Sequence, residues 1–278
     1  DLSISNLLIS GARIQNIQSN LEAKEGLIRL APITADLYGG TYSGKATFDA
    51  RKRKPEFTVS NSLSDVNLGD VFAETMKLGV ISGSVELDST INTEGTSMPV
   101  MLKKLNGNAT LSVNNGSVKG VNADKLLRKI EQMIECKCPQ ELPSGGRTTF
   151  SDLRGTLEIK NGVILNKDLL IDGNGFRLNG KGTLANFHND QINYDLNLAV
   201  AQSQARSGSS KYNLGGYALP IQCKGTIYKP SCKPDATQIL QQIAKRTATE
   251  KVKKVVGEKL KKALGGDAKE ALKSIFNF

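Results

Sequence analysis

The sequence predicts a mainly β fold: an extended, curved antiparallel sheet with a few short helices and a helical C-terminal segment. Three observations support this fold class. Apolar and polar residues alternate in short runs throughout residues 1–228, as half-buried strands require. Glycine- and asparagine-rich turn signals separate these runs. Loosely similar units recur along the chain, and such units stacked side by side make an extended sheet.

Each alternating run places its apolar side chains on one face of a strand. In "GKATFDA", for example, Ala46, Phe48 and Ala50 share a face. Because side chains point alternately to the two faces of a sheet, each run predicts one apolar face and one polar face. The other residues that follow this alternation are Val85, Leu87, Ile91, Ala109, Leu111, Val113, Leu157, Ile159, Leu178, Leu184, Ile192, Tyr194, Leu196, Leu198, Val200, Ile221, Cys223 and Ile227.

Short polar turns connect the predicted strands. Asn-Gly pairs favour tight hairpins, so we expect hairpins and meanders rather than crossovers. The segments 105–118 and 153–164 resemble each other, since both contain Leu-x-Gly, an alternating strand, Asn-Gly and an apolar pair. The turn signals are "EGL" at 25–27, "YGGTYSG" at 38–44, "DARKRKPEF" at 49–57, "NNG" at 114–116, "KNG" at 160–162 and "DGNG" at 172–175.

Two internal segments and the C-terminal region break the alternation. Residues 62–74 predict a short helix or turn, and residues 122–135 predict a helix that Asn122 caps. From residue 235 onward the sequence is amphipathic, with lysines opposite an apolar stripe. We therefore predict a β-rich region at residues 1–234 and a basic amphipathic helical tail at residues 235–278.

The net charge of +10 is concentrated in the predicted tail. Residues 235–278 carry ten cations and five carboxylates, which is half of the excess. The tail has no aromatic residues between its lysines to stack on bases, so we expect no nucleic-acid partner. Three interpretations are open: a solvated helix face, a helix packed on the open end of the sheet, and a surface that contacts anionic headgroups. The last interpretation assigns headgroup contacts to Lys251, Lys253, Lys254, Lys259, Lys261 and Lys262.

Aliphatic residues must build the core, because aromatic residues make up only 5% of the chain and tryptophan is absent. No stretch approaches the roughly 20 apolar residues of a membrane-spanning helix. The opening "DLSISNLLIS" has neither a basic n-region nor an initiator methionine. We interpret the chain as an internal segment, so that any signal or membrane anchor of the parent protein lies before Asp1.

The sequence offers little for catalysis. Its single histidine, His188, lies in the polar turn "ANFHNDQ" without a serine or cysteine nucleophile motif. No nucleophile elbow, phosphate-binding loop or zinc-protease motif occurs, and "GNG" at 173–175 lacks the strand-to-helix context of a dinucleotide site. We therefore expect a protein that is not an enzyme, with no catalytic residue, cofactor or metal.

Four cysteines fall in two clusters, Cys136 with Cys138 and Cys223 with Cys232. A four-cysteine zinc site is disfavoured, because neither spacing matches the usual knuckle. An even count in a β-rich chain favours disulfides and an oxidising compartment such as the periplasm. Three connectivities are open: each cluster paired within itself, or either of the two cross-pairings between the clusters.

Four segments give the chain its resemblance to a known family. They are "LIRLAPITADLYGGTYSGKATFDA" (27–50), "LNGNATLSVNNGSVKGVNADKLLRKI" (105–130), "TTFSDLRGTLEIKNGVILNKDLLIDGNGFRLNGKGTL" (148–184) and "LPIQCKGTIYKPSCKPD" (219–235). Their order and spacing resemble the C-terminal region of AsmA-family proteins over most of the chain. The cysteines and the lysine-rich tail depart from the family pattern, so neither a disulfide nor a function of the tail is inherited from it.

The resemblance implies both a fold and a role. AsmA-family proteins are anchored in the inner membrane of Gram-negative bacteria by an N-terminal helix, project into the periplasm, and are implicated in outer-membrane biogenesis and phospholipid transfer. They are similar to bridge-like lipid transporters, in which a long antiparallel sheet is curled into a trough with an apolar concave face. The chain is thereby expected to be a periplasmic, non-enzymatic lipid-handling module whose ligand is phospholipid.

The lipid groove expected from this resemblance is lined by apolar residues at alternating positions. Acyl chains lie along such a groove because each methylene taken out of water gains about 0.8 kcal/mol. Polar residues at groove positions would argue against this interpretation. The candidate lining residues are Phe48, Val85, Leu87, Leu111, Val113, Leu157, Ile159, Leu178, Leu184, Tyr194, Leu196 and Leu198.

Two other interpretations account for the same alternation. The core of an ordinary β-sandwich has the same period, so periodicity does not distinguish a closed core from a groove. A structural or assembly module would contact outer-membrane machinery, or another envelope protein, by edge-strand pairing or through its basic tail.

Overall fold

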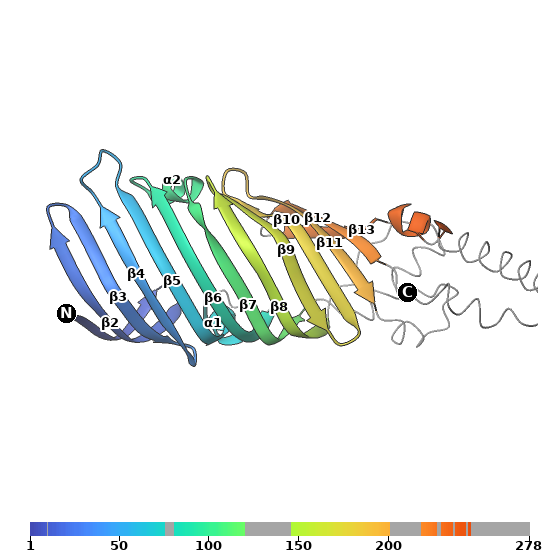
Figure 1. The fold of residues 1–278 in the computed structure, drawn as a ribbon, viewed down its shortest axis with the longest axis horizontal. Coiled ribbons are helices and arrows are strands. Elements are labelled where there is room, and N and C mark those ends of the chain that lie inside the picture. Colours follow the sequence, from blue (N-terminus) through green and yellow to red (C-terminus); the bar gives the residue numbers. More distant parts are fainter. Residues whose placement is uncertain are drawn as a thin grey trace, which may run out of the picture. The chain divides into compact units, whose positions relative to one another are not determined.

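One antiparallel sheet dominates the part of the chain that the structure describes. The computed structural model describes residues 1–9, 11–75, 81–119, 146–200, 218–226, 229–235, 237–242 and 244–245. Thirteen strands in this part pair strictly in chain order, and each is antiparallel to its neighbours. Figure 1 shows them following one another side by side from β2 to β13. The predicted fold class, with hairpins and meanders in place of crossovers, is confirmed.

Long strands and two short helices make up this sheet region. The helices are α1 (Leu68–Thr75), between β5 and β6, and α2 (Met98–Lys103), between β6 and β7. Figure 1 shows α1 and α2 near opposite ends of the strands. The strands are β1 (Leu2–Ile9), β2 (Ala12–Lys24), β3 (Leu27–Leu37), β4 (Gly40–Asp49), β5 (Glu56–Asn67), β6 (Ile81–Glu94), β7 (Asn106–Lys119), β8 (Arg147–Lys160), β9 (Val163–Gly173), β10 (Phe176–Asn186), β11 (Gln191–Val200), β12 (Ala218–Thr226) and β13 (Lys229–Pro234).

The chain divides into two compact units, residues 1–235 and residues 236–278. The first unit contains all of the strands, and in the second unit residues 237–242 and 244–245 are helical. The predicted helix at 122–135, Cys136 and Cys138, and the tail lysines from Lys251 to Lys262 lie outside the described residues. Among the helices of the described part, none has the length and apolar character needed to cross a bilayer.

Tight turns close the hairpins where glycine signals predict them. Glu25 and Gly26, Tyr38 and Gly39, and Asn161 and Gly162 each form a pair with positive φ at both residues, for example 46° at Asn161 and 74° at Gly162. This backbone geometry belongs to the two-residue turn whose twist matches that of the flanking strands. The turns predicted at "EGL", "YGG" and "KNG" are therefore confirmed.

The "NNG" segment at 114–116 is not a turn, contrary to the prediction, because β7 runs through it. Ser84 lies opposite Asn114 and Ser82 opposite Ser117, so β7 holds one extra residue at this point. Asn115 has a φ of 51°. The Asn-Gly pair therefore serves a β-bulge, which bends a strand and increases its local twist.

The segment at 62–74 is only partly helical, which corrects the second local prediction. Residues 62–67 continue β5, and α1 begins at Leu68. A bulge between Leu63 and Val66 interrupts the alternation there, which hides the strand in the sequence. The Asn67 side chain accepts a hydrogen bond from the Gly69 backbone N–H at 2.9 Å, which satisfies a free donor at the start of the helix.

The most buried side chains of the sheet gather beside α1. Val66 and Val113 are 1% exposed, and Val85 is 2% exposed. Leu68 and Val71 of α1 pack against this cluster, which Phe150 and Leu153 of β8 complete. β-branched valines suit this place, because they pack well on a pleated surface.

Candidate functional site

A continuous row of apolar residues crosses the sheet from β5 to β12. Residues that lie directly opposite one another in paired strands project from the same face. The row therefore defines a single surface, which we call the apolar face. The row consists, strand by strand, of Val66, Val85, Val113, Leu153, Ile171, Leu178, Leu198 and Leu219.

Eleven of the twelve predicted lining residues lie on the apolar face; at the twelfth, Leu184, a register shift between Thr183 and Ala185 interrupts the alternation. Register places Leu87 opposite Leu111, and alternation within each strand places the others. Phe48 lies opposite Phe57, at the end of the face near the β4–β5 turn. The buried members are Val85, Val113, Ile159, Tyr194 and Leu198, and the partly exposed ones are Phe48, Leu87, Leu111, Leu157, Leu178 and Leu196. Leu184 is the most exposed, at 37%.

The apolar face belongs to an open sheet rather than to a sandwich. In the described part of the chain, all strands belong to one sheet, so no second sheet covers this face. The sandwich interpretation is therefore wrong for these residues. Helix α1 covers one end of the face, and Leu87 and Leu111 remain partly exposed next to the cluster that it caps.

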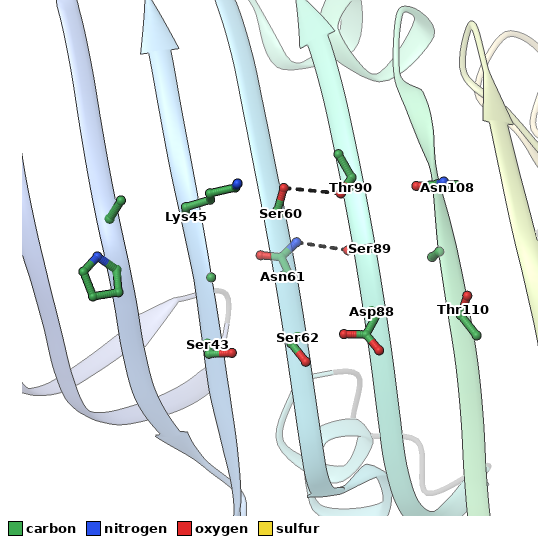
Figure 2. A pocket seen from close by; sticks show the side chains of 14 residues that line it. Ser43, Lys45, Ser60, Asn61, Ser62, Asp88, Ser89, Thr90, Asn108 and Thr110 are labelled. Carbon is green, nitrogen blue, oxygen red and sulfur yellow. Dashed lines mark hydrogen bonds between the residues drawn. The ribbon is translucent and has the colours of Figure 1, made fainter.

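The opposite face of the sheet is polar. One cross-strand row contains Ser43, Ser62, Asp88 and Thr110, and the next contains Lys45, Ser60, Thr90 and Asn108. A shallow cavity of about 640 Å³ lies over these two rows, across β3 to β7 (Figure 2). Ser60 and Thr90 hydrogen-bond through their hydroxyls at 3.3 Å. Hydroxyl, amide and charged groups keep this face hydrated, so the sheet is amphipathic from β4 to β7.

Three polar side chains on the apolar face form a hydrogen-bonded chain. The Tyr42 hydroxyl donates to Asn61 Oδ1 at 2.6 Å, and Asn61 Nδ2 donates to Ser89 Oγ at 3.2 Å. Polar residues at groove positions argue against an acyl-chain surface, so these three side chains count against lipid contact on this part of the face, although their hydrogen bonds lower the cost of burying them. These bonds are made within the protein, and in the described residues no buried side-chain nitrogen or oxygen lacks a partner.

The comparisons with known proteins identify the family. The model of the AsmA family matches residues 1–169, which span β1 to β8 and the first part of β9. The chain belongs to the AsmA family. No curated protein and no solved structure matches it.

A second polar cluster in this AsmA-family chain surrounds Asn166, which is only 2% exposed. Asn166 Oδ1 accepts hydrogen bonds from the Tyr194 hydroxyl and from the Leu169 backbone N–H. Its Nδ2 donates to the Thr156 carbonyl at 2.8 Å and to Asp168 Oδ1 at 2.9 Å. Burial raises the pKa of the Tyr194 hydroxyl, which therefore stays protonated and can donate. The cluster fixes β9 against β8 and β11.

Aromatic rings lie over glycines on the apolar face of this family member. A Cβ at Gly116 would lie 2.2 Å from Phe150 Cζ, and a Cβ at Gly173 would lie 2.0 Å from Phe176 Cε1. The rings thus fill the space that a side chain would occupy. Sequence analysis missed Phe150 and Phe176. Two polar residues separate Phe150 from Leu153, so Phe150 lies outside an alternating run, whereas Phe176 alternates with Leu178, and this alternation was the available signal. The glycines that face the two rings are set by strand pairing.

We expect Gly116→Ala to lower the free energy of unfolding by about 1–3 kcal/mol, because the new methyl group forces Phe150 out of its place. Urea unfolding followed by circular dichroism measures this change. Thr110→Ala, on the polar face of the same strand, is the control and should stay within about 0.5 kcal/mol. Equal stability of Gly116→Ala and the wild-type chain would show that the ring does not pack there.

A disulfide joins the last two strands of the sheet. Cys223 of β12 lies directly opposite Cys232 of β13, and the two are bonded. Of the three connectivities left open by the sequence, the structure shows the one that pairs these two cysteines with each other. It also rules out a four-cysteine zinc site that would include them.

Proposed function

We propose that the chain is a non-enzymatic lipid-handling module of the bacterial cell envelope. In this proposal it acts in the periplasm, and its apolar face holds phospholipid acyl chains during transfer between the inner and outer membranes, which contributes to outer-membrane biogenesis. The observation that carries the proposal is the apolar face of one open sheet, on which partly exposed side chains such as Leu87, Leu111 and Leu196 lie beside the largely buried row from Val66 to Leu219. Membership of the AsmA family is consistent with such an envelope role.

The energetics of the face favour acyl chains over a specific polar ligand. Each methylene transferred from water to an apolar surface gains about 0.8 kcal/mol, so a fatty acyl chain can bind without polar contacts. The partly exposed Leu87, Leu111 and Leu157 supply such a surface. Because this attraction is not directional, we expect broad acceptance of lipids with different headgroups.

Absence of catalysis is part of the same proposal. His188, the single histidine, is exposed in the turn between β10 and β11, where its ring Nε2 lies 2.7 Å from the Asn161 carbonyl oxygen. Through this contact His188 connects its own turn to the β8–β9 turn and stabilises both. In the proposed function, lipid slides along the face and no bond is made or broken.

An assembly module is the second candidate, and the free edge of the sheet favours it. Within the described residues β1 pairs with β2 on one side only. Leu8 of β1 is 70% exposed and Ile9 is 52% exposed. An edge strand with exposed apolar residues can accept a strand from another envelope protein.

Lipid extraction and native mass spectrometry of the chain, purified from the periplasm of a Gram-negative host, test the proposed function. We expect phospholipid to accompany the wild-type chain and to be lost from folded Leu111→Asp/Leu196→Asp, because carboxylates on the apolar face repel acyl chains. The matched control is Ser112→Asp/Asn197→Asp, which places the same charges on the polar face of the same strands and should retain lipid. Absence of lipid from the wild-type chain would favour the assembly module.

A further inference from the structure

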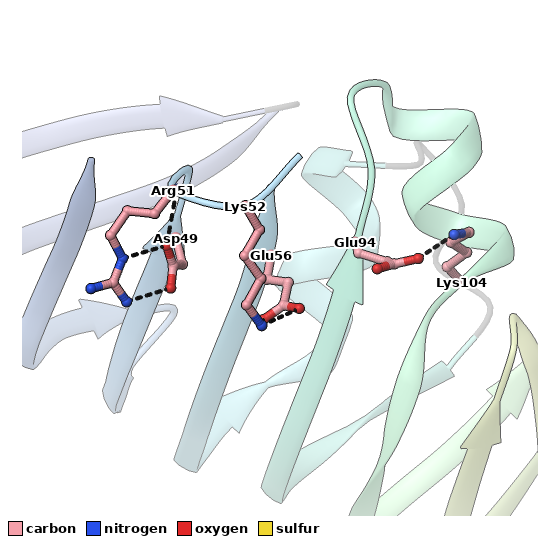
Figure 3. Close-up of polar contacts among 6 residues, drawn as sticks. All are labelled: Asp49, Arg51, Lys52, Glu56, Glu94 and Lys104. Atoms are coloured by element: carbon pink, nitrogen blue, oxygen red, sulfur yellow. Dashed lines mark hydrogen bonds and ion pairs between the residues drawn. The ribbon is translucent and has the colours of Figure 1, made fainter. Parts of the chain in front are cut away.

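Two connections lie side by side at one end of the strands: the β4–β5 turn (residues 50–55) and the β6–α2–β7 connection (residues 95–105). The Gly95 backbone N–H donates to the Pro55 carbonyl at 3.0 Å. Glu56 and Glu94, which begin β5 and end β6, lie directly opposite each other. Figure 3 shows side chains of both connections along this end of the sheet. We call the surface formed by residues 50–55 and 95–104 the basic rim.

Cations outnumber carboxylates at the basic rim and on the strand ends that carry it. Three ion pairs form there: Arg51 with Asp49 at 2.7 Å, Lys52 with Glu56 at 2.7 Å, and Lys104 with Glu94 (Figure 3). The Lys104 ammonium holds the pKa of Glu94 below its ordinary value, so that pair is charged at neutral pH. Within the described residues, the exposed Arg53, Lys54 and Lys103 have no carboxylate in an ion pair, which leaves an excess charge of +3.

Apolar side chains project into water from the same rim. Met98 is 67% exposed and Val100 is 42% exposed, although both begin the short helix α2. Val100 packs partly on Gly95, where an added Cβ would lie 2.9 Å from Val100 Cγ1. This packing orients the first turn of α2 and leaves Met98 exposed beyond it. A single exposed apolar side chain is ordinary on a protein surface. Two of them beside a cluster of cations form a surface that suits a partner with both apolar and anionic groups.

We propose that the basic rim binds the surface of a bilayer that contains anionic phospholipid, with Met98 and Val100 inserted among the headgroups and Arg53, Lys54 and Lys103 on the phosphates. Basic residues next to exposed apolar side chains are the combination that holds peripheral proteins at anionic interfaces. The rim has no aromatic residue to stack on a base, so nucleic acid fits it less well. The rim lies outside the predicted lining residues of the apolar face, so this inference goes beyond the proposed function.

The chain contains no tryptophan, which allows a fluorescence test at a single position. We would place the probe with Met98→Trp in the full chain and titrate it with vesicles of equal parts phosphatidylcholine and phosphatidylglycerol. The expected result is a blue shift of the emission and quenching by brominated acyl chains, with neither effect on vesicles of phosphatidylcholine alone. The matched control is Leu8→Trp, an equally exposed apolar position beside the β1–β2 turn at the opposite end of the strands, which should show no shift.

Neutralising the rim tests its charges separately. Each basic residue near an anionic surface contributes about a fivefold change in partition, so Arg53→Gln/Lys54→Gln/Lys103→Gln should raise the lipid concentration for a half-maximal shift by up to about a hundredfold. Vesicle binding without a shift at position 98 would place the contact elsewhere, for example on the C-terminal lysines, and would overturn the proposal. No vesicle binding, or equal shifts at positions 8 and 98, would also overturn it. Because lipid co-purification reports on the apolar face alone, the two proposals can fail independently.

Discussion

Replacing Val113 with aspartate is expected to abolish cooperative folding of the sheet. Val113 is 1% exposed and lies between Val85 of β6 and Leu153 of β8, in a cluster whose buried members among the described residues are all apolar. Burying an unpaired carboxylate costs several kcal/mol, which is a large part of the roughly 5–15 kcal/mol that stabilises a typical domain. Circular dichroism in a urea titration should show a strongly reduced or absent unfolding transition.

The neighbouring position is the matched control for this change. Ser112 projects from the polar face between Arg154 of β8 and Glu86 of β6, which both lie directly opposite it, so a new carboxylate there is hydrated, and attraction to the cation opposes repulsion from the carboxylate. Ser112→Asp should therefore change the free energy of unfolding by no more than about 0.5 kcal/mol. If Val113→Asp were as stable as Ser112→Asp, the assignment of residue 113 to the apolar face would be wrong.

Removal of the Asn166 side chain should produce the second large effect. Asn166→Ala leaves the Leu169 N–H and the Tyr194 hydroxyl without an acceptor and the Thr156 carbonyl without its side-chain donor. Of these three residues only Tyr194 is buried, and a buried polar group left unpaired costs about 1–3 kcal/mol; with smaller losses at the more exposed Leu169 and Thr156, we expect a loss of about 2–4 kcal/mol in the free energy of unfolding. Urea unfolding of the purified variant measures it.

A double-mutant cycle with Tyr194→Phe separates the contributions within this cluster. Tyr194→Phe removes one donor and leaves Asn166 its other partners, so alone it should cost about 1 kcal/mol. In the Asn166→Ala background the same change should cost less, because the hydroxyl has already lost its acceptor. Strictly additive losses would contradict the hydrogen bond between the two side chains.

The faces of the sheet could be predicted from sequence, because the side-chain period of a strand is exact enough to assign them locally. Leu111 and Val113, or Leu196 and Leu198, are two residues apart, and pairing in chain order then aligns their faces. The hairpins followed from glycine at positions of positive φ, such as Gly26 and Gly162. The strand faces and the hairpin turns depend on residues that are close together in the sequence, so local sequence patterns predict them.

Features set by pairing between distant residues escaped prediction. Asn115 reads as a turn residue, but pairing with β6 makes it part of a bulge. Phe150 is isolated among polar neighbours, and its partner Gly116 lies far away in sequence. The burial of Val113 compared with Leu111 depends on α1, which packs on one end of the face only. The alternation of apolar and polar residues in a strand predicts which face a side chain projects from, but not which other element covers that face.

Site-specific photo-crosslinking in Gram-negative cells tests the central claim most directly. A photoreactive diazirine amino acid would be placed in turn at positions 110, 111 and 112 of β7 and at 195, 196 and 197 of β11. If the apolar face holds acyl chains, phospholipid adducts should form at 111 and 196 and be absent at the flanking positions, which project from the polar face. Adducts at none of these positions, or at all of them equally, would contradict the claim that lipid lies on the apolar face.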